Sequence, residues 1–349
     1  MKKRYVLCTI AVLALVMALN LGYTKKVFSA EPLIIKYADP SKADTSRTRA
    51  AEETMKEIEK RTGGKVKHEF YWAQSLLKAK DVLKGIQAGT CDVGDATATI
   101  YHPARYPIWQ FTSLLFVGGN DQYAVIRACN ELYEKNPILK KEFDDQEVKL
   151  LSTSALTPTI IISNRALRDP ADFKGLRIRS LGTVAKWVAS LGAAPNPMSF
   201  YEVTEALARG VLDATQSYVY ATHAYKFYEH CKFLPLNGIN HIFIEYWINP
   251  DTLKKMPPDV QKIYIDTWRT FYVDRCVKYH DEEYELQIAD FKKSGVDVYS
   301  LTPAEVAKWK ETAASINNEY YKTMEEKGID GKKIVAEYQA LYDKYERKK

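Results

Sequence analysis

The stretch FKGLRIRSLGT, residues 173–183, places two arginines one position apart in an apolar, strand-like run that breaks at Gly182 and continues as a helix. Side chains alternate between the two faces of a strand, so Arg177 and Arg179 point to the same face, opposite Ile178. Arginine is seldom buried unless something pairs with it. This strand therefore predicts either a surface ion pair or a bound anion.

The first hundred residues after the N-terminal segment also alternate between strand and helix. Buried or alternating runs predict strands at 33–39, 65–72 and 91–98, and periodic apolar residues predict helices within 45–64 and 79–90. A βαβαβ order of this kind indicates a mainly parallel sheet with helices on its faces. The chain is therefore expected to be an α/β protein.

Two pairs of closely spaced strands predict that the chain crosses twice between two lobes. The first pair lies at 148–156 and 159–165, and the second at 231–238 and 242–249. A chain of 349 residues is also long enough for two α/β units. We therefore expect a clam-shell of two lobes with a cleft between them.

The lobes are expected to be discontinuous in sequence. Residues 258–294 have helical apolar spacing and no Gly or Pro after Pro258, which predicts one helix roughly 55 Å long that spans both lobes. The predicted division is lobe I from 31–156 plus 243–275, lobe II from 157–242, the long bridging helix from 258–294, and a C-terminal strand and helices packing on the lobes from 295–349.

The first 30 residues have a basic start, an apolar run and a small-residue end. This pattern is typical of a secretory signal peptide, with cleavage after Ala30 and a periplasmic mature protein. An uncleaved anchor is the alternative, because Phe28 stands where a small residue is preferred. No other apolar run approaches the roughly 20 residues that a membrane span needs.

Charge and cysteine usage exclude several classes of function. The chain has 50 Lys and Arg against 44 Asp and Glu, but five of the basic residues lie in the first 30. The remainder is almost neutral, which argues against nucleic-acid binding. The mature cysteines show no Cys-x-x-Cys spacing and are expected to be free and buried rather than paired; they are Cys91, Cys129, Cys231 and Cys276.

No motif for a cofactor or for catalysis was found. The sequence contains no Gly-x-Gly-x-x-Gly, Walker loop, Gly-x-Ser-x-Gly or His-Glu-x-x-His. His223 and His230 are seven residues apart, but a solvated or packed pair explains them better than a metal site does. We therefore expect no cofactor, no metal and no enzymatic activity.

Arg179 ends its strand directly before SLGTVAKW, where Thr183 can cap a helix. A guanidinium beside a helix N-terminus favours a carboxylate, because a bidentate pair and the helix dipole both stabilise the negative charge. Ligands of open α/β sheets also bind at the carboxyl ends of strands. We expect Arg179 to hold a ligand carboxylate, and Arg177 to form a surface ion pair.

The segment DPADFKGLRIRSLGTVAKWVASLGAAPNPMSFYEVTEALARGVLDATQS, residues 169–217, resembles the signature block of TRAP (tripartite ATP-independent periplasmic) transporter solute-binding proteins. AQSLLKAKDVLKGIQAGTCDVGDAT and LKKMPPDVQKIY also fit, so the resemblance covers 31–349. It implies a two-lobed periplasmic binding-protein fold, type II-like, that closes on an organic acid. The partners it implies are the small and large TRAP membrane subunits.

The resemblance also implies roles for individual residues. Arg179 matches the family's arginine that clamps the ligand carboxylate, and Phe200 matches an aromatic residue that lines the pocket. Ser217 stands where sialic-acid receptors have an asparagine that holds the same carboxylate. Thr159 and Thr97 replace a second arginine and a glutamate of those receptors, which weakens an assignment to sialic acid.

Aromatic residues favour a different ligand. Trp72, together with Tyr71, Tyr218 and Tyr246, could line a flat, apolar pocket, although core packing is an equal alternative for Trp72. Such a pocket would favour a hydrophobic or aromatic monocarboxylate over a sugar acid. From lobe I, contacts around Asp39, Trp72 and Thr97 are expected to favour the closed state once the carboxylate is bound.

Two other classes of function remain open at the level of sequence. One is a secreted enzyme that acts on an organic acid and uses Arg179 as a substrate anchor. The other is a binding protein that serves a sensor instead of a transporter. The receptor is expected to be a monomer and to bind no nucleic acid.

Overall fold

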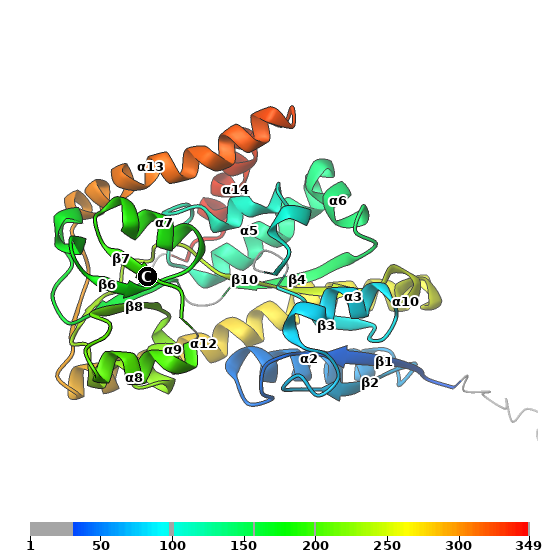
Figure 1. The fold of residues 1–349 in the computed structure, drawn as a ribbon. Helices are drawn as coiled ribbons and strands as arrows, with labels where there is room; N and C mark the ends of the chain where they lie inside the picture. The colour runs from blue at the N-terminus through cyan, green and yellow to red at the C-terminus, as the bar shows by residue number, and fades with distance from the viewer. Residues whose placement is uncertain (1–30, 98–100, 156–157, 199, 348–349) are drawn as a thin grey trace, which may run out of the picture.

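The fold was analysed in a computed structural model that describes residues 31–97, 101–155, 158–198 and 200–347. The predicted signal peptide lies outside the described residues. Figure 1 shows two α/β bodies side by side, each built around its own sheet. We call them lobe I, which contains the strands nearest the N-terminus, and lobe II, which contains the strand with Arg179.

The sheet of lobe I has the strand order β2-β1-β3-β10-β4. β1 pairs in parallel with β2 and β3, whereas β10 is antiparallel to β3 and β4. The strand predictions for this part of the chain are confirmed. The strands are β1 (Leu33–Ala38), β2 (Val66–Tyr71), β3 (Val93–Asp95), β4 (Lys149–Ala155) and β10 (Phe243–Ile248).

The sheet of lobe II has the strand order β11-β9-β5-β8-β6-β7. β6 is parallel to β7 and β8, and β5 is antiparallel to β8 and β9. Arg179 is the last residue of β6, as the sequence predicts. The strands are β5 (Ile160–Ser163), β6 (Arg177–Arg179), β7 (Ala194–Asn196), β8 (Ala214–Ser217), β9 (Phe233–Pro235) and β11 (Asp297–Tyr299).

Helices cover both sheets (Figure 1). Lobe I carries α2 (Ser46–Arg61), α3 (Val82–Gln87), α5 (Gln122–Lys135), α6 (Pro137–Asp144), α10 (Pro250–Lys255), α11 (Pro258–Arg269) and α14 (Gly331–Tyr345). Lobe II carries α7 (Gly182–Ser190), α8 (Val203–Ala208) and α9 (Val219–Ala224). Short 3-10 turns are η1 (Ala79–Asp81), η2 (Pro103–Arg105), η3 (Trp109–Ser113), η4 (Pro170–Phe173), η5 (Phe200–Glu202) and η6 (Phe227–Glu229).

The predicted bridging helix is present but is shorter than expected. The structure divides 258–294 into α11 and α12 (Phe271–Lys293), with a break at Thr270. The hydroxyl of Thr270 donates to the carbonyl of Asp266, and Thr267 bonds in the same way to Ile263. Hydroxyls that bond back to the preceding turn tend to bend helices, which explains why one continuous helix was a wrong prediction.

α12 connects the cores of the two lobes. Near its start, Tyr272 and Val273 belong to the apolar core of lobe I. Near its end, Ile288 and Phe291 belong to an apolar cluster of lobe II. Burial of both ends therefore fixes this helix across the junction.

α13 (Pro303–Glu326) is a second bridging helix, which the sequence does not predict. Trp309 and Ala313 pack into lobe II, whereas Tyr320 and Met324 pack into lobe I. In Figure 1 this helix, in orange, passes over both lobes. The lobes are thus joined by two helices as well as by the β4–β5 and β9–β10 connections.

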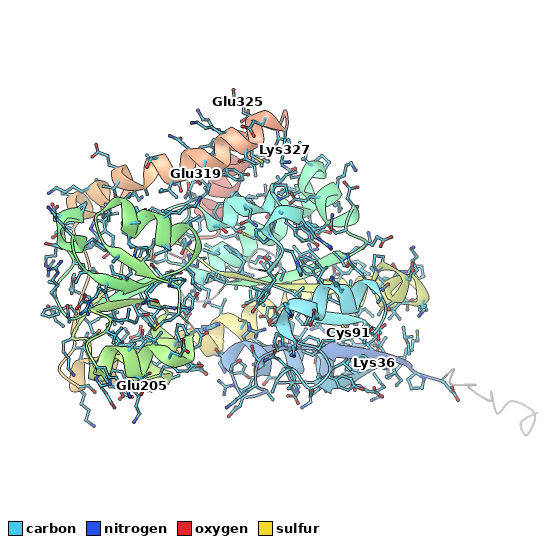
Figure 2. The ribbon with its side chains drawn as sticks, in the orientation of Figure 1. Lys36, Cys91, Glu205, Glu319, Glu325 and Lys327 are labelled. Carbon is cyan, nitrogen blue, oxygen red and sulfur yellow. The ribbon has the colours of Figure 1, made fainter. Side chains whose placement is uncertain are left out.

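Charged side chains lie on the surface of the protein, and its described cysteines lie inside. Charged side chains such as Glu205 on α8 and Glu319 and Glu325 on α13 project outwards (Figure 2). The four cysteines of the described residues are buried and free, as expected. None of the helices in the described part of the chain combines the length and apolarity needed to cross a bilayer.

Candidate ligand-binding site

Arg179 is a buried cation without an acidic partner. Only 8% of the residue is exposed. Its Nε donates to the carbonyl of Met198 at 3.2 Å, and its guanidinium carbon lies 5.0 Å from the centre of the Phe200 ring. No carboxylate of the described residues forms an ion pair with it. Burial lowers the pKa of Arg179, as expected for a desolvated charge that lacks an anion.

Arg177 provides the contrast within the same strand. Its Nε and Nη2 both donate to the carboxylate of Asp213, each at 2.8 Å. The residue is exposed, and the hydrogen bond to Asp213 raises its pKa. The surface ion pair expected for Arg177 is therefore present, and the two arginines differ because only Arg177 has an acid within reach.

The predicted cap of the following helix is not formed. α7 begins at Gly182, and its cap residue is Leu181 without a side-chain bond. Gly182 has φ 58°, a conformation that favours glycine and starts the helix one residue earlier than predicted. Thr183 consequently lies in the first turn, where its hydroxyl donates to the carbonyl of Ser113 at 3.0 Å. Thr183 thus binds a neighbouring backbone instead of capping.

Tyr218 lies near both Arg179 and Thr159. Burial raises the pKa of Tyr218, while the guanidinium of Arg179 and the hydroxyl of Thr159 act in the opposite direction. Ser217 differs, because its hydroxyl accepts from Thr222 at 2.9 Å and donates to the carbonyl of Tyr218 at 3.3 Å. The structure thus places Tyr218 beside Arg179, whereas the hydroxyl of Ser217 is used by hydrogen bonds within lobe II.

A cavity of about 510 Å³ lies between the lobes. Tyr218 and Tyr220 line it from lobe II, while Arg47, Asp95 and Thr97 line it from lobe I. A volume of this size is typical of small-molecule sites. On the lobe I side the lining of the cavity is markedly polar. This differs from the flat, apolar pocket that the sequence predicts.

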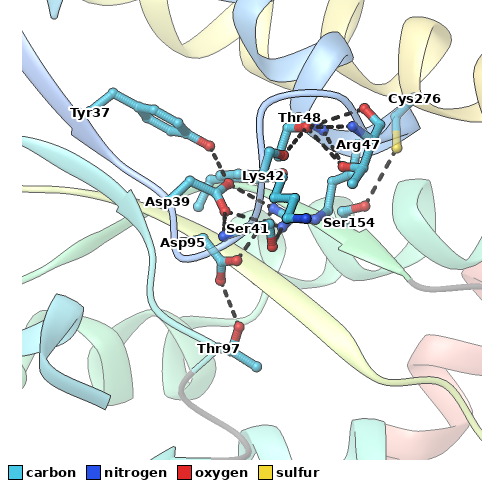
Figure 3. Close-up of polar contacts among 12 residues, drawn as sticks. Tyr37, Asp39, Ser41, Lys42, Arg47, Thr48, Asp95, Thr97, Ser154 and Cys276 are labelled. Atoms are coloured by element: carbon cyan, nitrogen blue, oxygen red, sulfur yellow. Dashed lines mark hydrogen bonds and ion pairs between the residues drawn. The ribbon is translucent and has the colours of Figure 1, made fainter. Parts of the chain in front are cut away.

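Arg47, which lines the cavity, is also the centre of a buried polar network in lobe I (Figure 3). Its Nη1 donates to Asp39 at 2.9 Å and to the hydroxyl of Tyr246 at 2.7 Å. Its Nη2 donates to the other oxygen of Asp39 at 3.2 Å and to Ser41 at 2.6 Å. Asp95 is the second acid beside this guanidinium, at 3.3 Å. One cation therefore faces two buried carboxylates.

Asp39 and Asp95 are held differently. Asp39 also accepts from the hydroxyl of Tyr37 at 2.8 Å and from the backbone of Ser41, so both of its oxygens are well satisfied. Burial raises the pKa of Asp95 to about 6, although Arg47 opposes the shift. Asp39 thus neutralises Arg47, and Asp95 remains as the less stabilised acid, on the lining of the cavity.

Two aromatic residues predicted for the pocket do not line the cavity: Tyr246 lies in the core of lobe I, and Trp72 packs against that core. Trp72 stacks on Phe70, with ring centres 5.7 Å apart, and meets Tyr37 edge-on at 5.2 Å. Tyr246 is fully buried, and its hydroxyl bonds to Arg47 and Tyr272. Neither residue lines the cavity. The expected apolar wall is therefore wrong for both, because each ring finds partners inside lobe I.

Thr97 lines the cavity, as predicted. Asp39 does not line it, but it binds Arg47, which does. Thr97 donates to Asp95 at 2.6 Å. Sequence reasoning missed Arg47, Asp95 and Tyr220. A signal was present for Asp95, because β1 and β3 are adjacent and parallel, so residues at their carboxyl ends lie close together.

No metal centre accompanies this cavity. Within the described ranges, no group of three or more His, Cys, Asp or Glu side chains could hold a metal ion. His223, one of the predicted loose pair, instead lies 3.0 Å from Asp290 through its Nε2. The site can therefore bind through charge and hydrogen bonds with the side chains that are present.

Two α/β lobes, two connecting strands, bridging helices and a cavity beside a buried cation define a solute-binding protein of the periplasmic type. The sequence profile of the bacterial extracellular solute-binding protein family 7 (DctP) matches residues 37–327. The chain belongs to this family, and it is a solute receptor of the TRAP type. This confirms the resemblance found in the sequence and the two-lobed α/β fold.

Known relatives span nearly the whole chain. The C4-dicarboxylate-binding periplasmic protein DctP of Rhodobacter capsulatus is 26% identical over 297 residues, which are 83% of this chain and 87% of that protein. A TRAP periplasmic solute-binding protein from Desulfovibrio salexigens, solved as an open complex, is 27% identical with a TM-score of 0.81, covering 91% and 98% of the two chains.

A more distant structure shares the fold alone. A TRAP solute-binding protein from Rhodoferax ferrireducens, solved with copurified benzoate, is 20% identical with a TM-score of 0.75. The match covers 90% of this chain and 98% of that chain. The two-lobed fold is thus kept at low identity, while the ligand has to be argued from the residues of this chain.

Proposed function

We propose that this chain is an extracytoplasmic receptor that holds a small organic acid through Arg179 and delivers it to the small and large TRAP membrane subunits. The observation that carries the proposal is the guanidinium of Arg179, which is buried beside Phe200 and has no acidic partner among the described residues. Burial of a charge is costly unless an anion pairs with it. A ligand carboxylate supplies that anion and can bind the guanidinium through two parallel hydrogen bonds.

Binding would begin on lobe II and close the protein. The carboxylate meets Arg179 first, and Tyr218 and Tyr220 contact the body of the ligand, since both tyrosines line the cavity. Lobe I then adds contacts that exist only when the lobes are close, which favours the closed state through differential affinity. The β9–β10 connection and the middle of α12, between Val277 of the lobe I core and Tyr284 at the lobe II cluster, are places where the chain can absorb this motion.

The ligand is proposed to be a monocarboxylate, with aromatic acids included. The Tyr218 and Tyr220 rings are stacked, with centres 5.8 Å apart and an interplanar angle of 10°. They offer a flat surface to a ring or chain attached to the carboxylate. Benzoate in the Rhodoferax relative and C4-dicarboxylates in the Rhodobacter relative mark the range of acids to test.

Calorimetry on Arg179→Ala tests the proposal. A carboxylate that binds the wild type should lose at least a hundredfold in affinity, as expected for a buried charged hydrogen bond left unmade. Arg177→Ala is the matched control, because its arginine lies on the same strand but is exposed and pairs with Asp213. Equal affinities for wild type and Arg179→Ala would refute the role of Arg179.

The same samples separate a receptor from an enzyme. An acid incubated with the purified protein and followed by NMR should remain chemically unchanged at equilibrium binding. Conversion of the acid would instead favour the secreted enzyme. A transport assay in vesicles that contain the membrane subunits would separate delivery to a transporter from service to a sensor.

A further inference from the structure

The lobe I side of the cavity offers a hydrogen-bond acceptor to the ligand. Asp95 lines the cavity, and only 3% of the residue is exposed. Its Oδ1 accepts from the hydroxyl of Thr97 at 2.6 Å. Its Oδ2 lies 3.3 Å from Nη1 of Arg47. Asp95 therefore has one oxygen held in a fixed position and one that faces a guanidinium.

The Oδ2 atom of Asp95 receives no hydrogen bond from that guanidinium. Both hydrogens of Nη1 are used, because this nitrogen donates to Asp39 and to Tyr246. Arg47 therefore stabilises the charge of Asp95 only through space. The backbone N–H of Thr97 also donates to this carboxylate. Each carboxylate oxygen can accept two hydrogen bonds, so Asp95 still has capacity to accept one from a ligand.

The charges around the cavity favour a donor over a second anion. Asp44, Asp95 and Glu283 line it, and Arg47 is the only lysine or arginine among the described residues that do so. Arg47 is already neutralised by Asp39. A second ligand carboxylate on this side would meet acids without a free cation, which costs affinity through like-charge repulsion.

A second polar group on the same lining also has an open position. His280 of α12 lines the cavity and is 5% exposed, and its Nε2 has no hydrogen-bond partner among the described residues. Its Nδ1 lies 3.4 Å from the hydroxyl of Ser46. Buried polar atoms are rarely left unpaired in native proteins. The unpaired Nε2 of His280 and the spare acceptor capacity of Asp95 both favour a polar ligand group on this side.

We propose that Asp95 is a specificity-determining residue that accepts a hydrogen bond from a hydroxyl or ammonium group on the part of the ligand remote from its carboxylate. The inference rests on the proposed function, in which Arg179 holds the carboxylate at lobe II. The receptor then selects hydroxy- or amino-substituted monocarboxylates and rejects dicarboxylates. The discrimination arises because Arg179, next to the cavity-lining Tyr218, offers a cation on the lobe II side, whereas Asp95 offers an acceptor on the lobe I side.

Matched sets of acids test this selectivity. Each set keeps one carboxylate and varies the opposite group: 4-methylbenzoate, 4-hydroxybenzoate, 4-(aminomethyl)benzoate and terephthalate, and the corresponding linear acids. Calorimetry should show that hydroxyl or ammonium binds at least tenfold more tightly than methyl in one of the sets, since hydrogen bonds to charged groups are worth about that factor or more. The second carboxylate should bind at least tenfold more weakly than methyl.

The variant Asp95→Asn identifies the residue responsible. It keeps an acceptor oxygen but removes the charge, so the advantage of ammonium over hydroxyl should fall at least fivefold and the dicarboxylate should gain affinity. Asp259→Asn is the control, because Asp259 of α11 is exposed and does not line the cavity, and it should leave the ranking unchanged. Thermal melts verify that both variants are folded.

The outcomes distinguish the two proposals. If monocarboxylates bind through Arg179 but dicarboxylates bind best, or if Asp95→Asn leaves the ranking as it was, the role of Asp95 is overturned and the receptor function stands. If no acid in any set binds, or if Arg179→Ala binds all of them as the wild type does, the proposed function fails and the inference fails with it.

Discussion

Arg47 and Arg179 are both buried, but they differ in their partners. Arg47 uses its Nη1 and Nη2 donors on Asp39, Ser41 and Tyr246, which are residues of its own lobe. Among the described residues, Arg179 donates to the carbonyl of Met198 and lies against the ring of Phe200, with Tyr218 nearby. Arg47 is therefore a structural cation that also borders the cavity, and Arg179 is the cation available to a ligand.

This difference predicts the stability of an Arg47→Ala variant. Removal of one partner from a buried ion pair leaves uncompensated charge, which typically costs about 3–5 kcal/mol. Asp39 and Asp95 would both lose their counter-ion, so the free energy of unfolding measured with urea should fall by about that amount. Lys141→Ala, which removes an exposed pair with Asp145, should cost less than about 1 kcal/mol. Equal effects of the two variants would contradict the structural role of Arg47.

The docking of α14 on α5 is an electrostatic contact as well as an apolar one. Glu131 of α5 accepts hydrogen bonds from Lys344 at 2.9 Å and from the hydroxyl of Tyr345, both near the C-terminus. Lys135 also donates to it. Burial opposes ionisation of Glu131, but these donors outweigh it and lower its pKa to about 2.

The shift predicts how acid affects this contact. The pKa of Glu131 is lower in the folded state than the ordinary value of 4.5, so its contribution to stability is complete above about pH 4.5 and is lost as the pH falls towards 2. Glu131→Gln should therefore be less stable than the wild type by about 1–3 kcal/mol at pH 7. The difference between the two should shrink on acidification through that window.

Urea denaturation at a series of pH values measures this difference. Glu326→Gln serves as the control, because that carboxylate is exposed near the end of α13. It should follow the wild type at every pH. A gap between Glu131→Gln and wild type that stays constant from pH 7 to strongly acidic pH would show that Glu131 is not the titrating group.

Much of the element order could be predicted because the relevant signals are local. Runs of buried residues and alternation within a few positions located β1 to β5 and the strand with Arg179. The break at Thr270 was missed, since nothing in the apolar spacing of 258–294 marks a bend. α13 was not recognised as a bridge, because its two ends have the same helical pattern and differ only in the lobe they meet.

The site could be predicted only in part. The position of Arg179 followed from its place at a strand end, and the closeness of Phe200 from a family resemblance. The directions of Trp72 and Tyr246 depend on which side chains neighbouring strands bring to them, and that is set by pairing between distant segments. The network of Arg47 joins residues from β1, α2, β3 and β10, so it becomes visible only in the assembled sheet.

At the scale of the whole molecule, the proposed site has two complementary halves, one on each lobe. In this proposal, lobe II provides Arg179 next to the tyrosines of the cavity, and lobe I provides the acid-rich wall with Asp95. α12 and α13 keep the halves attached, because each has one end buried in either core. A ligand that touches both halves stabilises their approach, which is how binding becomes a change of shape that membrane subunits can recognise.

The central claim is that Arg179 holds the carboxylate of the transported acid. A crystal structure of the protein with its copurified or best-binding acid tests it most directly. The account predicts both carboxylate oxygens at about 2.7–2.9 Å from the guanidinium nitrogens of Arg179, with Phe200 beside them. A bound acid whose carboxylate lies elsewhere, with Arg179 still bonded only to the carbonyl of Met198, would contradict it.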